Sequence, residues 1–232
     1  MKNAGILYIV ATPIGNLEDI TFRAVRILED VDVVLCEDTR VTHKLLEHYH
    51  LETKTMSYFQ HSALAKVDTI IKMLEDGVKM ALVTDAGTPG ISDPGQALIH
   101  SIQMADNSIP IIPIPGSSAL TAVASVSGMI EKEFYFAGFL PKKKGRQTEF
   151  KLLSLLNCPI IIYESPLRLE KTLKDISEYF GSKTEVFIAR EVTKMFEEYW
   201  GGKILDVMRE LSEHTLKGEV VLIVKRSDKF KI

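Results

Sequence analysis

Short continuous apolar runs alternate with segments of helical periodicity along almost the whole chain, and this alternation limits the fold more than any other feature. The first run, GILYIVA at 5–11, is rich in β-forming residues and has no polar face, as expected of a strand buried on both sides. The next segment, 19–30, has apolar residues at the spacing of one helix face, and Asp19 is its predicted N-cap. Strand–helix alternation of this kind predicts an α/β fold.

The alternation forms two series, which predict two α/β units rather than one sheet. The first series continues with strands at 31–36, 79–84 and 109–114 and with helices at 41–49, 61–77, 95–106 and 118–128. The second has strands at 134–139, 159–164, 184–191 and 217–226 and helices at 147–157, 165–181 and 203–213. We therefore expect an N-terminal α/β domain at 1–115, a linker helix region at 116–133 and a C-terminal α/β domain at 134–232.

The composition is that of an ordinary globular protein. Hydrophobic residues make up 46% of the 232 positions and charged residues 25%. The apolar runs are far shorter than the ~20 residues that a membrane span needs, and the first is too short for the core of a signal peptide. We therefore expect a cytoplasmic protein. Cys36 and Cys158 form no CxxC pair, so a disulfide framework or structural zinc site is not expected, and no metal is predicted.

Charge is distributed unevenly along the chain. The formal net charge is −3, but residues 1–133 hold 10 Lys and Arg against 17 Asp and Glu, whereas 134–232 hold 18 against 14. A nucleic-acid-binding protein usually needs a basic face, and only the C-terminal half leaves room for one. The one basic cluster in the sequence is Lys142–Lys144 with Arg146.

In open α/β sheets, ligands bind outside the carboxyl ends of the strands, and three predicted loops of unusual composition lie there. The first loop, ATPIGNLED at 11–19, has Pro13 and Gly15 where a dinucleotide-binding loop would carry G-x-G-x-x-G. The chain also lacks G-x-x-x-x-G-K-[ST]. Ordinary dinucleotide binding and P-loop nucleotide binding are therefore disfavoured.

The second loop, TDAGTPGISDPG at 84–95, combines flexible and rigid positions. Its three glycines allow main-chain N–H groups to approach a ligand closely, and its prolines lower the entropy lost on binding. Asp85, directly after the predicted strand, is placed to accept hydrogen bonds from a polar or cationic ligand. The alternative is that Asp85 and Asp93 only cap turns.

The third loop, PIPGSSALTAV at 113–123, has a glycine–serine–serine turn before a helix of small residues. Such a turn offers free N–H donors and two hydroxyls to a polar group. Simple N-capping of the helix is the alternative interpretation.

The three loops belong to a longer series of motifs. Between about residues 5 and 224 the chain contains, in this order, YIVATPIGNLEDIT, CEDTR, VTDAGTPGISDPG, PIPGSSA, YESPLRL, ARE-x-TK and KGEVV. With these motifs it resembles the ribosomal small-subunit RNA (cytidine-2′-O)-methyltransferase family, within the tetrapyrrole methylase superfamily. Members of that family usually continue with a further small C-terminal segment, whereas this sequence ends at SDKFKI.

The resemblance implies a two-domain fold in which each domain is a mixed sheet flanked by helices, a cleft between the domains that binds S-adenosylmethionine, and a homodimer. It also implies 2′-O-methylation of a cytidine ribose, that of cytidine 1402 in the decoding region, with 16S ribosomal RNA or the small ribosomal subunit as substrate. Carried over by motif, the cofactor-binding residues are Ile14, Asp85, Thr88, Ser118, Ala119, Tyr163 and Glu219.

A ribose hydroxyl is a poor nucleophile while protonated, so the reaction would benefit from a general base. The catalytic candidates are Asp38 in CEDTR, Glu164 in YESP and Glu191 in ARE-x-TK, with Glu37 beside Asp38; each follows a predicted strand. Nearby basic residues could bind RNA phosphates or orient these carboxylates: Arg40, Arg168, Arg190 and Lys194. The alternative is a structural network of acidic and basic side chains.

Phosphate attraction needs positive charge but no particular shape, so the basic cluster is the expected contact with the RNA backbone. The predicted RNA-binding residues are Lys142, Lys143, Lys144 and Arg146, together with Arg40, Arg168 and Lys194. A solvated loop is the alternative for the cluster.

Two other functions compete with this prediction. One is methylation of a tetrapyrrole carbon on the same fold, which should require a broader apolar cleft. The other is a non-catalytic module that senses the cofactor or binds ribosomes. Cys36 and Trp200 are expected to be packing residues.

Overall fold

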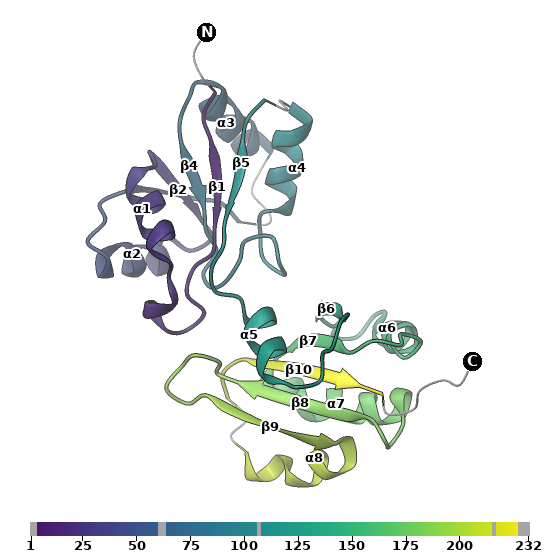
Figure 1. The fold of residues 1–232 in the computed structure, drawn as a ribbon. Coiled ribbons are helices and arrows are strands. Elements are labelled where there is room, and N and C mark those ends of the chain that lie inside the picture. The colour runs from purple at the N-terminus through teal and green to yellow at the C-terminus, as the bar shows by residue number, and fades with distance from the viewer. Residues whose placement is uncertain (1–3, 60–63, 106–107, 215–216, 227–232) are drawn as a thin grey trace. The chain divides into compact units, whose positions relative to one another are not determined.

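The computed structural model describes residues 4–59, 64–105, 108–214 and 217–226 (Figure 1). The chain divides into two compact units, Met1–Ser118 (unit 1) and Ala119–Ile232 (unit 2), each of which is described by itself. The segment predicted as a linker, 116–133, is divided by this boundary, because its helix belongs to unit 2.

Unit 1 is built on a five-stranded sheet in the order β3-β2-β4-β1-β5. All four strand pairings are parallel, with Leu7 opposite both Met80 and Ile111. The strands are β1 (Leu7–Val10), β2 (Val33–Cys36), β3 (Lys54–Ser57), β4 (Met80–Leu82) and β5 (Ile111–Ile114).

Helices cover both faces of this sheet (Figure 1). They are α1 (Phe22–Asp30), α2 (Thr39–His48), α3 (Leu64–Glu75) and α4 (Gln96–Ala105), with a 3₁₀ turn η1 (Leu17–Asp19) before α1. Leu7 and Ile9 pack with α3 and α4, whereas Val10 and Val34 pack with α1 and α2. Because each face has its own apolar layer, the strands β1, β2, β4 and β5 are continuous apolar runs, as the sequence indicated.

One local prediction in unit 1 was wrong, and one strand was missed. The N-cap of α1 is Thr21, whose side chain accepts a hydrogen bond from Ala24 N, while the predicted cap Asp19 lies in the 3₁₀ turn that Asn16 begins. Strand β3 was not predicted, because its sequence KTMS is short and polar. It lies at the edge of the sheet, where full burial is not required.

Unit 2 contains a five-stranded mixed sheet in the order β6-β7-β10-β8-β9. Only the β6–β7 pairing is parallel, and the other three pairings are antiparallel. The strands are β6 (Tyr135–Phe139), β7 (Ile160–Glu164), β8 (Glu185–Arg190), β9 (Glu198–Lys203) and β10 (Val220–Lys225). Strand β9 was not predicted; Gly201 allows it to pair closely with β8, because a Cβ there would lie 2.5 Å from Val186 O.

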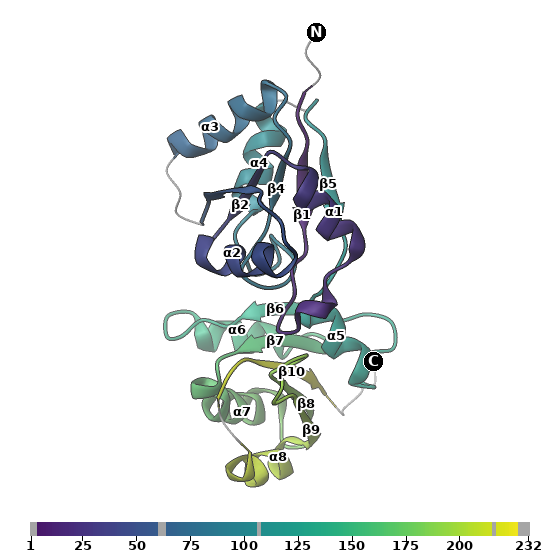
Figure 2. The same ribbon diagram turned by 90° about the vertical axis from the view of Figure 1, so that its left-hand side faces the viewer.

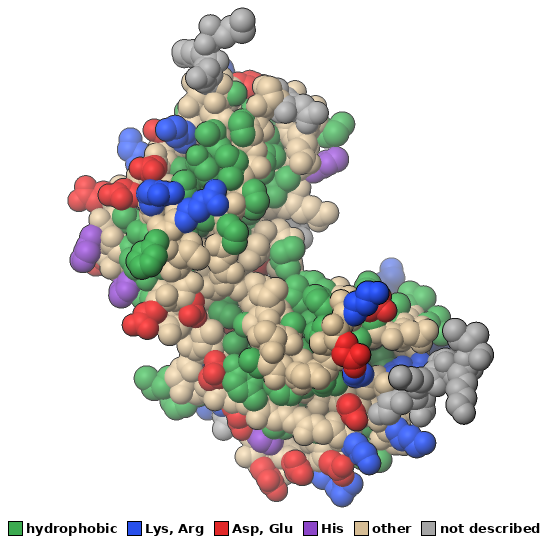
Figure 3. All heavy atoms as spheres, viewed as in Figure 1, with side chains coloured by type: hydrophobic (Ala, Val, Ile, Leu, Met, Phe, Trp, Pro, Cys, Tyr) green, Lys and Arg blue, Asp and Glu red, His purple; other side chains and the backbone are tan. Residues whose placement is uncertain are grey.

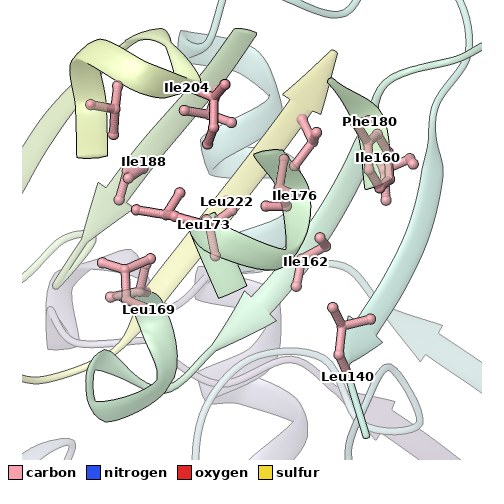
Figure 4. Close-up of a cluster of buried hydrophobic side chains, with 14 of the residues drawn as sticks. Leu140, Ile160, Ile162, Leu169, Leu173, Ile176, Phe180, Ile188, Ile204 and Leu222 are labelled. Atoms are coloured by element: carbon pink, nitrogen blue, oxygen red, sulfur yellow. The ribbon is translucent and has the colours of Figure 1, made fainter. Parts of the chain in front are cut away.

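The helices of unit 2 are α5 (Ala119–Val126), α6 (Arg146–Leu153), α7 (Pro166–Phe180) and α8 (Ile204–Glu210), with a 3₁₀ turn η2 (Leu211–Glu213). Helices α6, α7 and α8 pack their apolar side chains on this sheet, and α7 and α8 lie on one side of it in Figure 2. Leu169, Leu173 and Ile176 of α7 enter the core at helical spacing and meet Ile162 and Leu222 of the sheet (Figure 4). Helix α5 packs against β10 from the other face (Figure 1).

Candidate active site

The loops after β1 and β4 are joined at the carboxyl end of the first sheet. Thr12 and Gly87 exchange two backbone hydrogen bonds, of 2.9 and 3.0 Å. The buried Thr12 hydroxyl donates to Thr84 O at 3.1 Å, which ties the start of one loop to the start of the other. Gly87 has φ +85°, a backbone conformation that residues with a Cβ rarely adopt, so glycine is favoured here. Thr12 and Thr84 were missed in the sequence, although each is a polar residue at the end of an apolar run.

The loop after β5 meets the same edge. The Thr88 hydroxyl donates to Ser117 O at 3.2 Å, and the Ser117 hydroxyl donates to Asp19 O at 3.0 Å. A Cβ at Gly116 would lie 3.0 Å from the Ala11 Cβ, so the chain passes close to the end of β1. The three loops that the sequence analysis selected are therefore adjacent in unit 1.

The CEDTR segment after β2 joins this group. Asp38 N donates to Asp85 Oδ1 at 3.2 Å, so the ends of β2 and β4 are connected through a carboxylate. The Asp38 carboxylate accepts hydrogen bonds from the Arg40 guanidinium, the shortest of 2.6 Å from Nη2, and from Arg40 N at 2.9 Å as the N-cap of α2. These interactions with Arg40 lower the pKa of Asp38 to about 2.

Glu37 is in the opposite situation. Glu37 is an exposed residue. Its carboxyl is still partly shielded from water, which raises its pKa, and the charges of Asp85 and Asp38 raise the pKa further. Neither an ion pair nor a hydrogen bond links the Glu37 side chain to another of the described residues. Burial raises the pKa of the Cys36 thiol, which lies in the core, as expected of a packing residue.

The seven predicted cofactor-binding residues are divided between the units. Ile14, Asp85 and Thr88 lie in the joined loops of unit 1, and Ser118 is its last residue. Ile14 Cγ2 is 3.4 Å from the position of a Cβ on Gly87, so this side chain lies against the glycine turn. In unit 2, Ala119 begins α5, Tyr163 lies edge-on to the rings of Phe136 and Phe139, and Glu219 precedes β10.

The structure does not support Glu164 as a base. Its side chain is fully buried and accepts hydrogen bonds from the Thr172 hydroxyl at 2.6 Å and from Ser165 N at 2.8 Å. Arg168 Nε lies 3.2 Å from the same carboxylate, and Arg168 Nη2 donates to Leu140 O at 2.7 Å. Both charged groups of YESPLR are therefore engaged inside unit 2, and Arg168 is not free for an RNA phosphate.

Glu191 is held in a strained loop after β8. It has φ +52°, and its Oε1 accepts from Lys194 Nζ and from Glu219 N, both at 2.9 Å. Lys194 also bridges to Glu219 Oε2 at 2.9 Å. Burial acts to raise the pKa of Glu191, but Lys194, the Glu219 amide and Arg190 together lower it below its usual range. The buried Arg190 is itself paired with Glu198, Nε to Oε2 at 3.0 Å.

The basic cluster contains one residue that the prediction misjudged. Lys142, Lys143 and Lys144 are exposed, but Arg146 is only 5% exposed. Its guanidinium donates to Asp175 Oδ2, Pro141 O and Thr172 Oγ1, and it lies 4.9 Å from the centre of the Phe150 ring. Arg146 is thus a packing residue of unit 2 rather than an exposed contact.

Neither a metal-binding cluster nor a membrane-spanning helix occurs in the part of the chain that the structure describes. No group of three or more His, Cys, Asp or Glu side chains is arranged to hold a metal ion. No helix in the same residues combines the length and apolarity that crossing a bilayer requires. On the face drawn in Figure 3, acidic and basic side chains are interspersed.

Residues 6–208 match the family model "Tetrapyrrole (Corrin/Porphyrin) Methylases". Ribosomal RNA small subunit methyltransferase I of Synechocystis sp. is 44% identical over 221 residues, which are 95% of this chain and 78% of the relative. The chain belongs to this methyltransferase family. The resemblance seen in the motifs, the two-unit α/β fold class and the prediction of an enzyme are thereby confirmed.

Other relatives differ in length. The Thermotoga maritima protein of the same name is 42% identical over 220 residues, covering 95% of this chain and 98% of the relative, so relatives of similar length exist. Among solved structures, a diphthine synthase matches with TM-score 0.72 at 12% identity, over 97% of this chain and 92% of that one. Uroporphyrin-III C-methyltransferase of Thermus thermophilus complexed with S-adenyl homocysteine matches with TM-score 0.63 at 15% identity, over 94% and 97%. At this low sequence identity, these structures support the fold of this chain but not its substrate.

Proposed function

We propose that this methyltransferase transfers a methyl group from S-adenosylmethionine to the ribose 2′-oxygen of a cytidine in 16S ribosomal RNA, at position 1402. The observation that carries the proposal is the identity of 40–44% over nearly the whole chain to proteins named for small-subunit ribosomal RNA methylation. The nucleoside and the atom are proposed from the resemblance of the CEDTR, YESPLRL and ARE-x-TK motifs to the (cytidine-2′-O)-methyltransferase family. We also propose a homodimer located in the cytoplasm.

The joined loops of unit 1 fit the chemistry of the cofactor. S-adenosylmethionine has an amino acid, a ribose and a sulfonium, and so needs both hydrogen-bond donors and a nearby negative charge. The loops offer an exposed Asp85 carboxylate, main-chain groups beside Gly87, and the apolar Ile14 side chain. When bound, the cofactor supplies an electrophilic methyl group, and the protein's part is to align it with the acceptor. Ser118, Ala119, Tyr163 and Glu219 remain proposed contacts.

Of the four carboxylates considered as the base, Glu37 fits best. Glu164 is buried and saturated, Glu191 is paired with Lys194, and both oxygens of Asp38 accept from Arg40. Glu37 has an exposed carboxylate, a raised pKa and a position at the carboxyl end of β2. A raised pKa makes a carboxylate a stronger base for the hydroxyl proton. We propose that the Asp38–Arg40 pair acts indirectly, by fixing the start of α2 directly after Glu37.

Exposed cations would hold the RNA backbone. We propose the lysines of the basic cluster, with Arg40 and Lys194 as lesser contacts because both already pair with carboxylates. Low identity to the tetrapyrrole-methylating structures leaves carbon methylation of a tetrapyrrole without specific support.

The deciding experiment is single-turnover methylation of small ribosomal subunits that lack the modification, with labelled S-adenosylmethionine. Digestion of the RNA and mass spectrometry should locate one 2′-O-methylcytidine at position 1402. Label on another nucleotide or on a base would overturn the finer proposal, and no label in RNA would overturn the substrate. Calorimetric titration with S-adenosylmethionine, with Asp85→Asn as the weakened variant, tests the cofactor separately.

A further inference from the structure

A cavity of about 370 Å³ lies on unit 2, between the start of α6 and one face of α7. Lys171, Asp175 and Tyr179 line it from α7, one residue per helical turn. From the other side, Lys143 and the first turn of α6 line it, including Gln147 and Thr148. The basic cluster of the sequence is thus divided, because Lys142 and Lys144 do not line the cavity.

The acidic group of the cavity is already neutralised. Asp175 accepts from the buried Arg146, with Nη2 at 2.7 Å and Nε at 2.8 Å. Arg146 lies over Phe150, and Phe150 stacks on Tyr179 with ring centres 5.7 Å apart, so three of the lining side chains pack against one another. In contrast, neither Lys143 nor Lys171 forms an ion pair with a carboxylate of the described residues, and both are exposed. The cavity therefore carries two uncompensated positive charges.

The backbone adds hydrogen-bond donors to these charges. Gly145 is the N-cap of α6 with φ +82° and has no side chain to cap the helix. The first helical bond runs from Glu149 N to Gly145 O at 2.9 Å, so the amides of Gln147 and Thr148 precede it. Free amides at this end attract an anion, in support of the two lysines.

We propose that this cavity binds one nucleotide of the RNA substrate through its backbone phosphate, held by Lys143, Lys171 and the amides that begin α6. The volume lies in the range of pockets for small ligands and exceeds what a phosphate alone requires. This inference rests on the proposed function for the identity of the RNA, but not for the phosphate chemistry. It assigns Lys171, which no motif indicated, to RNA binding.

The test uses the full chain and a fluorescent single-stranded oligoribonucleotide with the target sequence, titrated at several salt concentrations. The variant is Lys143→Gln with Lys171→Gln. Its matched control, Lys151→Gln with Lys174→Gln, removes the same charge from exposed lysines of α6 and α7 outside the cavity. We expect the magnitude of the slope of log K against log[salt] to fall by about 0.7 in the first double variant, since one phosphate contact on a single strand contributes about 0.7. The control should keep the wild-type slope. Equal losses in both would overturn the proposal.

Two further arms separate the possible outcomes. Competition with inorganic phosphate and with cytidine monophosphate identifies the source of the phosphate. If a low concentration of either compound displaces the RNA, the RNA assignment is overturned. Methylation of small ribosomal subunits separates this inference from the proposed function. If wild type does not methylate RNA but the Lys143/Lys171 variant still loses RNA binding, the proposed function falls and the cavity stands. If wild type methylates and the variant binds normally, the reverse holds.

Discussion

Glu37 and Asp38 are neighbours in the sequence, yet their carboxylates are in opposite electrostatic surroundings. The Arg40 guanidinium holds the pKa of Asp38 at about 2, whereas partial burial and two adjacent carboxylates raise the pKa of Glu37. A group with a raised folded-state pKa contributes stability below its unfolded pKa and loses it as pH rises through the folded pKa. The charged form that a base needs is therefore destabilising here, as is common at functional sites.

We expect Glu37→Gln to lower single-turnover methyl transfer by about 10²-fold or more, because it removes proton acceptance. Its melting temperature at pH 7 should be equal to or higher than that of wild type, because glutamine resembles the protonated form. The wild-type rate should rise with pH through the raised pKa of Glu37. Asp38→Asn is the comparison: it weakens the exposed Arg40 pair but can still cap α2, so it should lower the rate less than Glu37→Gln does. A Glu37→Gln enzyme with the wild-type rate would exclude this residue as the base.

For Glu164 we expect the reverse of the Glu37 result, a substitution that lowers stability but not activity. Glu164→Gln leaves Arg168 without its charged partner inside unit 2, so we expect a loss of about 2 kcal/mol in the free energy of unfolding measured with urea. At temperatures where the variant is folded, methyl transfer should remain near wild type. Lost activity with unchanged stability would restore Glu164 as a catalytic candidate.

At the scale of elements, the site depends on how strand ends are joined. Parallel strands bring their carboxyl ends to one edge, and the Thr12–Gly87, Thr88–Ser117 and Asp38–Asp85 hydrogen bonds connect the loops there. Gly87 has little freedom to change, because its φ of +85° is costly for any residue with a Cβ.

We expect Gly87→Ala to lower the free energy of unfolding by about 1–2 kcal/mol and to weaken S-adenosylmethionine binding in calorimetry. Gly128→Ala is a matched control, since Gly128 has φ +63° and open space around its Cβ position but lies outside the joined loops. It should be destabilised similarly while cofactor affinity is unchanged. Similar affinities for the two variants would show that the Gly87 turn does not form part of the cofactor site.

At the scale of the whole molecule, each unit has its own hydrophobic core. None of the three buried clusters among the described residues combines side chains of both units. The single tryptophan, Trp200, lies in unit 2, so its fluorescence reports that unit, whereas far-UV circular dichroism reports both. We expect the two probes to give non-coincident urea transitions for the full chain. Coincident transitions would show that the units unfold together.

The sequence by itself determined the α/β class, most strands and helices, and the three loops of unit 1, because apolar periodicity and turn residues act over a few positions. It could not reveal β3 or β9, whose polar or glycine-containing segments become strands only when a neighbouring strand pairs with them. Only the tertiary structure decided that Arg146 and Glu164 are each buried and paired within unit 2. It also decided that Glu37 alone of the four candidate bases has no partner among the described residues, and that Lys171 joins Lys143. Burial and pairing depend on residues far apart in the chain, which local patterns do not encode.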